Sequence, residues 1–204
     1  MTFVFIIIFL FFSCFIFNRY YYLSIYVDGS SMYPTLNRNR DDSRYDFGIV
    51  DPHQSAINKI KRFDIITTYY PWESQDYNLP YKKGDKAKES AEYKIKRVIA
   101  LPNETFKIEN NNLYLLNETS QEFEKIVFPF TRNIGSQISS TDKIYTLASD
   151  EYWVMGDNWE NSMDCLDAKS PIYKENVVGV LVAIEGTCDS KGNNRHYSWP
   201  RYFF

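Results

Sequence analysis

The chain has 204 residues, enough for one ordinary domain with a modest insertion. Its formal net charge is -3 and no long run of Lys or Arg occurs, so we expect no nucleic-acid partner. The three cysteines, Cys14, Cys165 and Cys188, form neither a disulfide framework nor a metal-ligand pattern, so we expect no metal and no cofactor. Cys165 and Cys188 could pair in an oxidising compartment, although free thiols are the simpler expectation. With 17 Tyr and 15 Phe, the composition favours strands over helical bundles.

Residues 3–17, FVFIIIFLFFSCFIF, are uncharged and dominated by Phe and Ile. As a helix they would measure about 22 Å at ~1.5 Å per residue, which is short of a hydrocarbon core of ~30 Å. Extending the helix to Val27 makes it long enough, with Arg19 and several tyrosines near the headgroups. The sequence therefore predicts one N-terminal transmembrane helix over residues 1–27.

Two other interpretations of this apolar block stay open. A cleaved signal peptide usually has a basic start and a small-x-small cleavage site, and no Lys or Arg precedes the block. A buried core helix usually has a polar face, which is missing here. A retained anchor fits best, and Arg19, which follows the block, weakly favours a cytosolic C-terminal part.

The rest of the chain predicts a mainly β fold. Several segments combine β-branched or aromatic residues with alternation or short apolar runs, which is typical of strands. These segments are residues 47–50, 62–70, 91–101, 151–155 and 176–184.

The segments between these strands are less uniform. The charged stretch 72–90 is expected to be a surface loop, and TFKIENNNLYLLNE, residues 105–118, predicts a hairpin with the Asn run at its turn. Residues 117–143 show too little pattern to assign. Together they indicate a small inserted β subdomain over residues 103–150.

The decapeptide VDGSSMYPTL, residues 27–36, begins a few residues after the apolar block. Gly29 lets the backbone approach a ligand closely, and Pro34 fixes the exit of the turn. A serine in such a turn can be a nucleophile if a base takes its proton. His53 and His196 are the two histidines and lie far apart in the sequence, so a lysine is the better candidate base.

Lys96 is the lysine that fits this role best. It lies in the predicted strand 91–101, on the same face as Val98 and Ala100. An exposed lysine has a pKa of about 10.4 and is charged, so burial would have to lower the pKa by about 3 pH units. The alternative is that Lys96 and Arg97 lie on an edge strand and protect that edge by their charge.

Four stretches, VDGSSMYPTL, RFDII, YKIKRVIALP and GDNWENSMD, occur in this order and resemble the conserved boxes of type I signal peptidases, which are membrane-anchored Ser/Lys proteases. The first box is most similar to the Gram-positive bacterial form. The resemblance implies a mainly β, signal-peptidase-like ectodomain with a small inserted β subdomain, preceded by one transmembrane helix.

The resemblance also implies a function and a location. The expected activity is removal of N-terminal signal peptides from secreted pre-proteins by a serine endopeptidase, without a cofactor. The expected location is the plasma membrane, crossed once, with the catalytic domain, residues 28–204, on the extracytoplasmic side and in contact with membrane lipid.

Residue by residue, the resemblance makes Ser31 the nucleophile and Lys96 the general base. Ser30 matches a variable position. Ser162 corresponds to a serine that orients the lysine, and Asp164 to a structural carboxylate beside the site. The backbone N–H of Ser31 is expected to contribute to the oxyanion hole.

The chain departs from the family pattern at three positions. Gly29 stands where Gram-negative members supply a serine hydroxyl as a second oxyanion donor. Trp159 and Leu166 replace two arginines that are common in the last box, including the usual partner of Asp164. Asp164 then needs another cation, and Arg97 is a candidate.

The family cuts after small residues at the -1 and -3 positions. By position, Met32, Leu36 and Ile95 are candidates to line the shallow pockets for these residues, with ordinary core packing as the alternative. Three other functions stay open. They are a mitochondrial inner-membrane peptidase, a self-cleaving repressor-type Ser/Lys protease, and a catalytically dead membrane-anchored binding protein.

Overall fold

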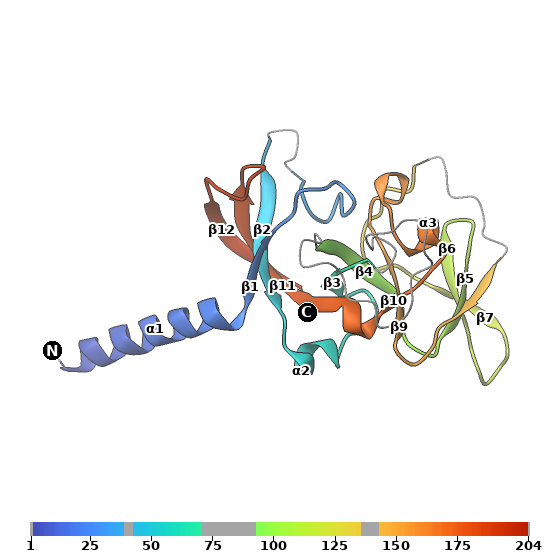
Figure 1. Ribbon diagram of the computed structural model, residues 1–204, viewed down its shortest axis with the longest axis horizontal. Helices are drawn as coiled ribbons and strands as arrows, with labels where there is room; N and C mark the ends of the chain where they lie inside the picture. The colour runs from blue at the N-terminus through green and yellow to red at the C-terminus, as the bar shows by residue number, and fades with distance from the viewer. Residues whose placement is uncertain (1, 39–42, 71–92, 136–142, 204) are drawn as a thin grey trace.

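The computed structural model describes residues 2–38, 43–70, 93–135 and 143–203 (Figure 1). The first half of the chain contains α1 (Thr2–Tyr21), β1 (Leu23–Tyr26), β2 (Tyr45–Asp51), α2 (Gln54–Ile57), β3 (Ile65–Thr68), β4 (Lys94–Ala100) and β5 (Thr105–Glu109). The second half contains β6 (Asn112–Leu116), β7 (Phe123–Ile126), β8 (Ile144–Thr146), β9 (Glu151–Met155), η3 (Trp159–Asn161), α3 (Cys165–Ala168), β10 (Ile172–Tyr173), η4 (Lys174–Asn176), β11 (Val177–Cys188) and β12 (His196–Tyr202). The predicted mainly β class is confirmed. The charged stretch 72–90 lies outside the described residues.

An eight-stranded sheet forms the larger part of the molecule. Its strand order is β1-β2-β11-β3-β4-β9-β10, and β12 also pairs with β11. The pairs are antiparallel, and β11 is a strand of 12 residues that pairs with β2, β3 and β12. Its register shifts between Leu181 and Ala183 and between Ile184 and Gly186, which lets one long strand bend from one set of partners to the next.

A second sheet of four strands, in the order β7-β6-β5-β8, is built from residues 105–146. Figure 1 places it at the opposite end of the molecule from α1. The predicted hairpin is present as β5 and β6. Asn110 and Asn111 form its turn with φ of 47° and 61°, and two positive φ values are what a tight two-residue hairpin turn requires.

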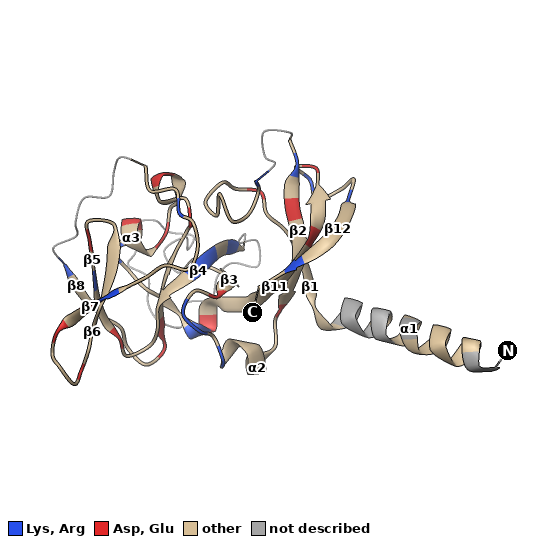
Figure 2. Cartoon of the chain, turned by 180° about the vertical axis from the view of Figure 1, so that it is seen from behind, with Lys and Arg blue, Asp and Glu red and all other residues tan. Residues whose placement is uncertain are grey.

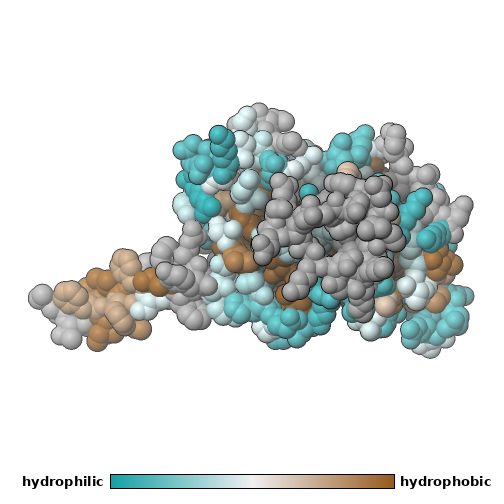
Figure 3. All heavy atoms as spheres, in the orientation of Figure 1, coloured by the Kyte–Doolittle hydropathy of each residue, from teal (hydrophilic) through white to brown (hydrophobic). Residues whose placement is uncertain are grey.

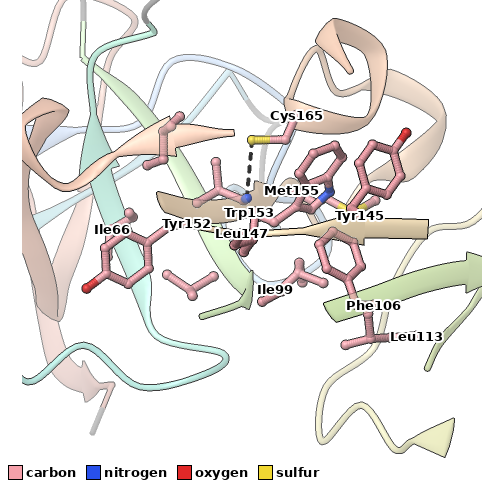
Figure 4. Close-up of a cluster of buried hydrophobic side chains, with 14 of the residues drawn as sticks. Ile66, Ile99, Phe106, Leu113, Tyr145, Leu147, Tyr152, Trp153, Met155 and Cys165 are labelled. Carbon is pink, nitrogen blue, oxygen red and sulfur yellow. Dashed lines mark hydrogen bonds between the residues drawn. The ribbon is translucent and has the colours of Figure 1, made fainter. Parts of the chain in front are cut away.

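The two sheets share one hydrophobic core (Figure 4). The ring of Trp153 on β9 lies 5.2 Å from the ring of Phe106 on β5 and 4.4 Å from that of Tyr145 on β8, measured between centroids. Trp153 and Phe106 are fully buried. Because one indole contacts both strands, the small sheet is held against the large one by packing and not by the connecting chain alone.

The N-terminal helix is shorter than predicted. α1 ends at Tyr21, and residues 23–26 form β1, which pairs with β2, so the predicted continuation of the helix to Val27 is wrong. The backbone of this stretch, rich in aromatic and branched residues, finds its hydrogen-bond partners in a neighbouring strand instead. Among the described residues, no helix combines the length and the apolar character needed to span a bilayer.

The described cysteines are not linked. Cys165 and Cys188 are both buried and free, so the disulfide considered from the sequence is absent. Cys165 packs in the shared core, where its sulfur accepts a hydrogen bond from the Val154 N–H at 3.3 Å (Figure 4). Burial raises the pKa of the Cys165 thiol, which keeps the sulfur protonated and unreactive.

Candidate active site

Ser31 lies in the turn that joins β1 to β2. The Tyr33 N–H donates to Ser30 O at 3.0 Å and the Leu36 N–H donates to Met32 O at 2.9 Å, which gives two consecutive tight turns. Met32 and Leu36 are 0% exposed and pack against the large sheet below. The apolar residues of the decapeptide therefore fix the turn and leave Ser31 partly exposed.

Lys96 reaches this turn from β4. Its Nζ lies 2.8 Å from Ser31 Oγ and 3.1 Å from Ile95 O, and the ring of Tyr70 lies 5.8 Å away. Lys96 is only 4% exposed. Figure 2 shows basic residues (blue) on β4, and that strand pairs with β3 on one side and β9 on the other. The sheet-edge interpretation of Lys96 is therefore wrong, because β4 is an interior strand.

Asp164 and Ser162 lie in the loop after β9. Ser162 Oγ donates to Asp164 Oδ2 at 2.6 Å, and the same oxygen accepts from the Gly156 N–H at 2.9 Å. The Leu166 N–H donates to the other oxygen at 3.0 Å. A hydroxyl and two backbone amides thus satisfy the carboxyl group. The contact described for Ser162 is with Asp164, so direct orientation of Lys96 by Ser162 stays a prediction.

Arg97 has a different partner from the one considered. It forms a two-point ion pair with Asp157, in which Nε lies 2.7 Å from Oδ1 and Nη2 lies 2.6 Å from Oδ2. The side chains are 7% and 1% exposed. Thr35 donates to Asp157 as well, at 2.5 Å. The suggested pairing of Arg97 with Asp164 is wrong, because alternation along β4 turns Arg97 to the face opposite Lys96.

The expected pocket residues pack in the core. Met32 and Leu36 are in a buried cluster with Ile65, Leu181 and Ile184, and Ile95 packs against its border, partly exposed. Whether they meet substrate stays a prediction. No group of three or more metal-ligating side chains comes together within the described part of the chain.

Several residues that touch the site carry no recognisable signal in the sequence. The Tyr70 hydroxyl donates to Met163 O at 2.8 Å, and so ties the end of β3 to the loop that carries Ser162. Asn158 donates from its backbone to Ser31 O at 2.9 Å. The Gly-Asp-Asn sequence at residues 156–158 is typical of a turn, but a turn motif alone does not say which carbonyl its amides will meet.

At Gly156 the backbone after β9 closely approaches both the Ser31 turn and the Ser162 side chain. A Cβ built at Gly156 would lie far inside van der Waals contact with Ser31 O and Ser162 Oγ, whereas one at Gly29 would find its nearest atom at 4.0 Å. Gly156→Ala should therefore destabilise the protein by about 3 kcal/mol, the upper end for overpacking. Gly29→Ala is the matched control and should lose less than about 1 kcal/mol. Equal losses in chemical denaturation would contradict the close approach.

Asp164 should make stability depend on pH. Burial, the largest influence, raises its pKa above the ordinary value of 3.8, while hydrogen bonds from Ser162, Gly156 and Leu166 and the charge of Lys96 act the other way. The folded state then holds the proton more tightly than the unfolded chain, so this group's contribution to stability is full at low pH. It is lost as pH rises above about 3.8 through the folded pKa.

The measurement is the free energy of unfolding of the wild type and of Asp164→Asn at a series of acidic and neutral pH values. The amide cannot titrate, so changed hydrogen bonds add a constant offset and the slope is the readout. We expect the wild type to lose stability relative to the variant as pH rises. A wild type that gains stability relative to Asp164→Asn as pH rises would contradict the raised pKa of Asp164.

A mainly β chain with a serine and a buried lysine in contact is the arrangement expected of a serine peptidase. The family described as signal peptidase, peptidase S26, matches residues 1–184. The chain therefore belongs to this family, as a type I signal peptidase of the Gram-positive form.

Two Bacillus relatives agree with this assignment. Signal peptidase I P of Bacillus subtilis subsp. natto is 25% identical over 158 residues, which cover 75% of this chain and 70% of that protein. Signal peptidase I of Bacillus amyloliquefaciens is 29% identical over 160 residues, which cover 75% and 68%. A crystal structure of a signal peptidase I from Enterococcus faecalis superposes with a TM-score of 0.40 and 20% identity, over 61% of this chain and 97% of that one.

Proposed function

We propose that this protein is a membrane-attached serine endopeptidase that removes N-terminal signal peptides from exported pre-proteins, with Ser31 and Lys96 as its catalytic dyad. Family membership supports the substrate class. The observation that carries the proposal is the 2.8 Å separation of Lys96 Nζ and Ser31 Oγ, because a base must lie within hydrogen-bond reach of the proton it takes.

In the proposed mechanism, neutral Lys96 accepts the hydroxyl proton while Ser31 Oγ attacks the scissile carbonyl carbon. The developing oxyanion accepts a hydrogen bond from the Ser31 N–H. Lys96 then gives the proton to the departing amine, the C–N bond breaks, and the signal peptide remains as an ester on Ser31. A water molecule, deprotonated by Lys96, hydrolyses the ester, and the proton returns to Ser31 Oγ.

The direct test is a single-turnover reaction of purified protein with a pre-protein that has Ala at -1 and -3. We expect one cut after the -1 residue. The control is the same pre-protein with Trp at -1, which should not be cut if the proposed pockets are shallow. Binding of the pre-protein without any cleavage would favour the catalytically dead homologue and would contradict the proposal.

The proposal includes attachment to the plasma membrane through α1, with residues 28–204 on the extracytoplasmic side. Support comes from α1 itself, which leads away from the β sheets (Figure 1) and exposes apolar side chains between Val4 and Ile16 (Figure 3). These exposed residues include Val4, Phe5, Ile6, Ile7, Ile8, Phe9, Leu10, Phe12 and Ile16. Burying so many apolar side chains in lipid is favourable by roughly 25 cal/mol per Å².

Protease treatment of intact cells or spheroplasts checks this arrangement. We expect residues 28–204 to be digested from outside while a cytosolic marker protein stays intact. Digestion only after the membrane is permeabilised would contradict the proposed orientation, and release of the full chain by alkaline carbonate washing would contradict attachment by α1.

A further inference from the structure

The segment after β7, residues 128–133, links the small sheet to the candidate site. Phe130 lies under the guanidinium of Arg97, with 3.8 Å between the charged group and the ring centre. Arg132 lies 4.6 Å from the ring centre of Trp159 in the same way. The first contact reaches Arg97, which follows Lys96 in the chain, and the second reaches η3, in the loop after β9 that also carries Ser162.

Asn133 makes the most directional of these links. Its backbone N–H donates to Asp157 O at 2.8 Å, and the Trp159 N–H donates to Asn133 O, also at 2.8 Å. These two bonds form a short parallel bridge opposite Asn158. The side chain adds a third bond, in which Asn133 Nδ2 donates to Asn158 Oδ1 at 2.8 Å.

Asn158 also binds the backbone of the Ser30–Ser31 turn, which carries the proposed nucleophile. Its backbone N–H donates to Ser31 O at 2.9 Å, and its Nδ2 donates to Ser30 O at 3.1 Å. Asn158 is buried, so its side-chain oxygen needs a donor and its side-chain nitrogen needs an acceptor. Because Oδ1 accepts from Asn133, Nδ2 must face Ser30 O. Without Asn133 the buried Oδ1 loses its donor, and only the 3.1 Å bond to Ser30 O is left to fix the orientation of the amide.

We infer that Asn133 is a positioning residue for the nucleophile, acting through the Asn158 amide to hold the Ser30 and Ser31 carbonyls. The inference rests on the proposed function, and it gives the small sheet a part in the reaction. It predicts a loss in the rate of the chemical step, because a displaced Ser31 Oγ no longer meets the substrate carbonyl at the required angle.

The test compares Asn133→Ala with Asn117→Ala in the same purified full-length protein. Asn117, directly after β6, is the control. Its exposed Nδ2 donates to Glu124 on β7 at 2.6 Å, and its Oδ1 accepts from the Thr119 and Ser120 N–H groups, so its bonds stay within this hairpin. For Asn133→Ala we expect kcat for a pre-protein to fall about tenfold with KM within twofold, since only the positioning term changes. The control should keep both constants, at a similar thermal midpoint.

A second readout does not depend on activity. Amide hydrogen exchange at Met32 and Tyr33 should be faster in Asn133→Ala than in the wild type or the control. Should Asn133→Ala fail to fold, Asn133→Asp replaces it, since this side chain has nearly the same size and keeps the backbone bridge. Its carboxylate faces Asn158 Oδ1 with no hydrogen to donate, so the same losses are expected.

A double variant tests whether Asn133 and Asn158 act through the same interaction. The double variant Asn133→Ala/Asn158→Ala should be no slower than Asn158→Ala alone, because both changes remove one linked interaction. Unchanged kcat and exchange in the Asn133 variants, or fully additive losses, would overturn the inference. A wild type that cleaves no pre-protein would overturn the proposed function, while the exchange comparison would still decide the role of Asn133.

Discussion

Ser31→Ala and Lys96→Ala will each lower kcat for pre-protein cleavage by about three orders of magnitude or more. The first change removes the proposed attacking oxygen, and the second removes the proposed base, whose Nζ lies 2.8 Å from that oxygen. The double variant should be no slower than either single variant, because the two side chains act as one unit. Single-turnover rates measured below the unfolding temperature of each variant are the readout.

Ser30→Ala is the matched control for the dyad. The contacts described for Ser30 come from its carbonyl, which accepts from Tyr33 N and Asn158 Nδ2, and alanine keeps that carbonyl. We expect Ser30→Ala to retain most of the wild-type rate. The opposite pattern, with Ser30→Ala inactive and Ser31→Ala active, would mean that the nucleophile has been placed one residue too late.

Asp157→Ala should destabilise the protein by about 3–5 kcal/mol, the range for removing one partner of a buried ion pair. Arg97 would keep its charge while 7% exposed, with its two-point partner gone. Thr35 would lose an acceptor at the same time. The free energy of unfolding from chemical denaturation measures the effect.

The comparison for this effect is Glu109→Ala. Glu109 pairs with Lys107 at 2.8 Å on the small sheet, with exposures of 43% and 29%, and such exposed pairs contribute about 0–1 kcal/mol. Replacing both Arg97 and Asp157 with Leu should cost much less than Asp157→Ala, because no charge is left buried alone. Equal losses for Asp157→Ala and Glu109→Ala would rule out a tightly buried pair.

Local patterns predicted those parts of the fold that local interactions decide. The β-branched runs around Ile65–Thr68 and Lys94–Ala100 became adjacent strands, and the Asn run became a hairpin turn. The proximity of Ser31 and Lys96 came from the family resemblance, since 65 residues separate them along the chain. No periodicity in either segment specifies that distance.

Contacts between distant segments decide the features that local sequence patterns do not predict. Arg97 pairs with Asp157 and not with Asp164 because of the face of β4 from which its side chain projects. That face is set by the register of β4 with β3 and β9. Residues 23–26 left the predicted helix because β2 offers partners for their backbone. Asn133 lies in a stretch of sequence with no recognisable period, and the role inferred for it depends on its contacts with Asn158 in the loop after β9.

The place of β11 in the large sheet sets when, during synthesis, the site can first assemble. β11 lies between β2 and β3, so among the described strands it alone joins the half that carries the Ser31 turn to the half that carries Lys96. It spans residues 177–188, so at a synthesis rate of about 5–20 residues per second it leaves the ribosome several seconds or more after Ser31 and Lys96. A nascent chain that has already exposed both residues still lacks the strand between them. The proposed protease is therefore expected to stay inactive until β11 has been synthesised and has paired with both strands.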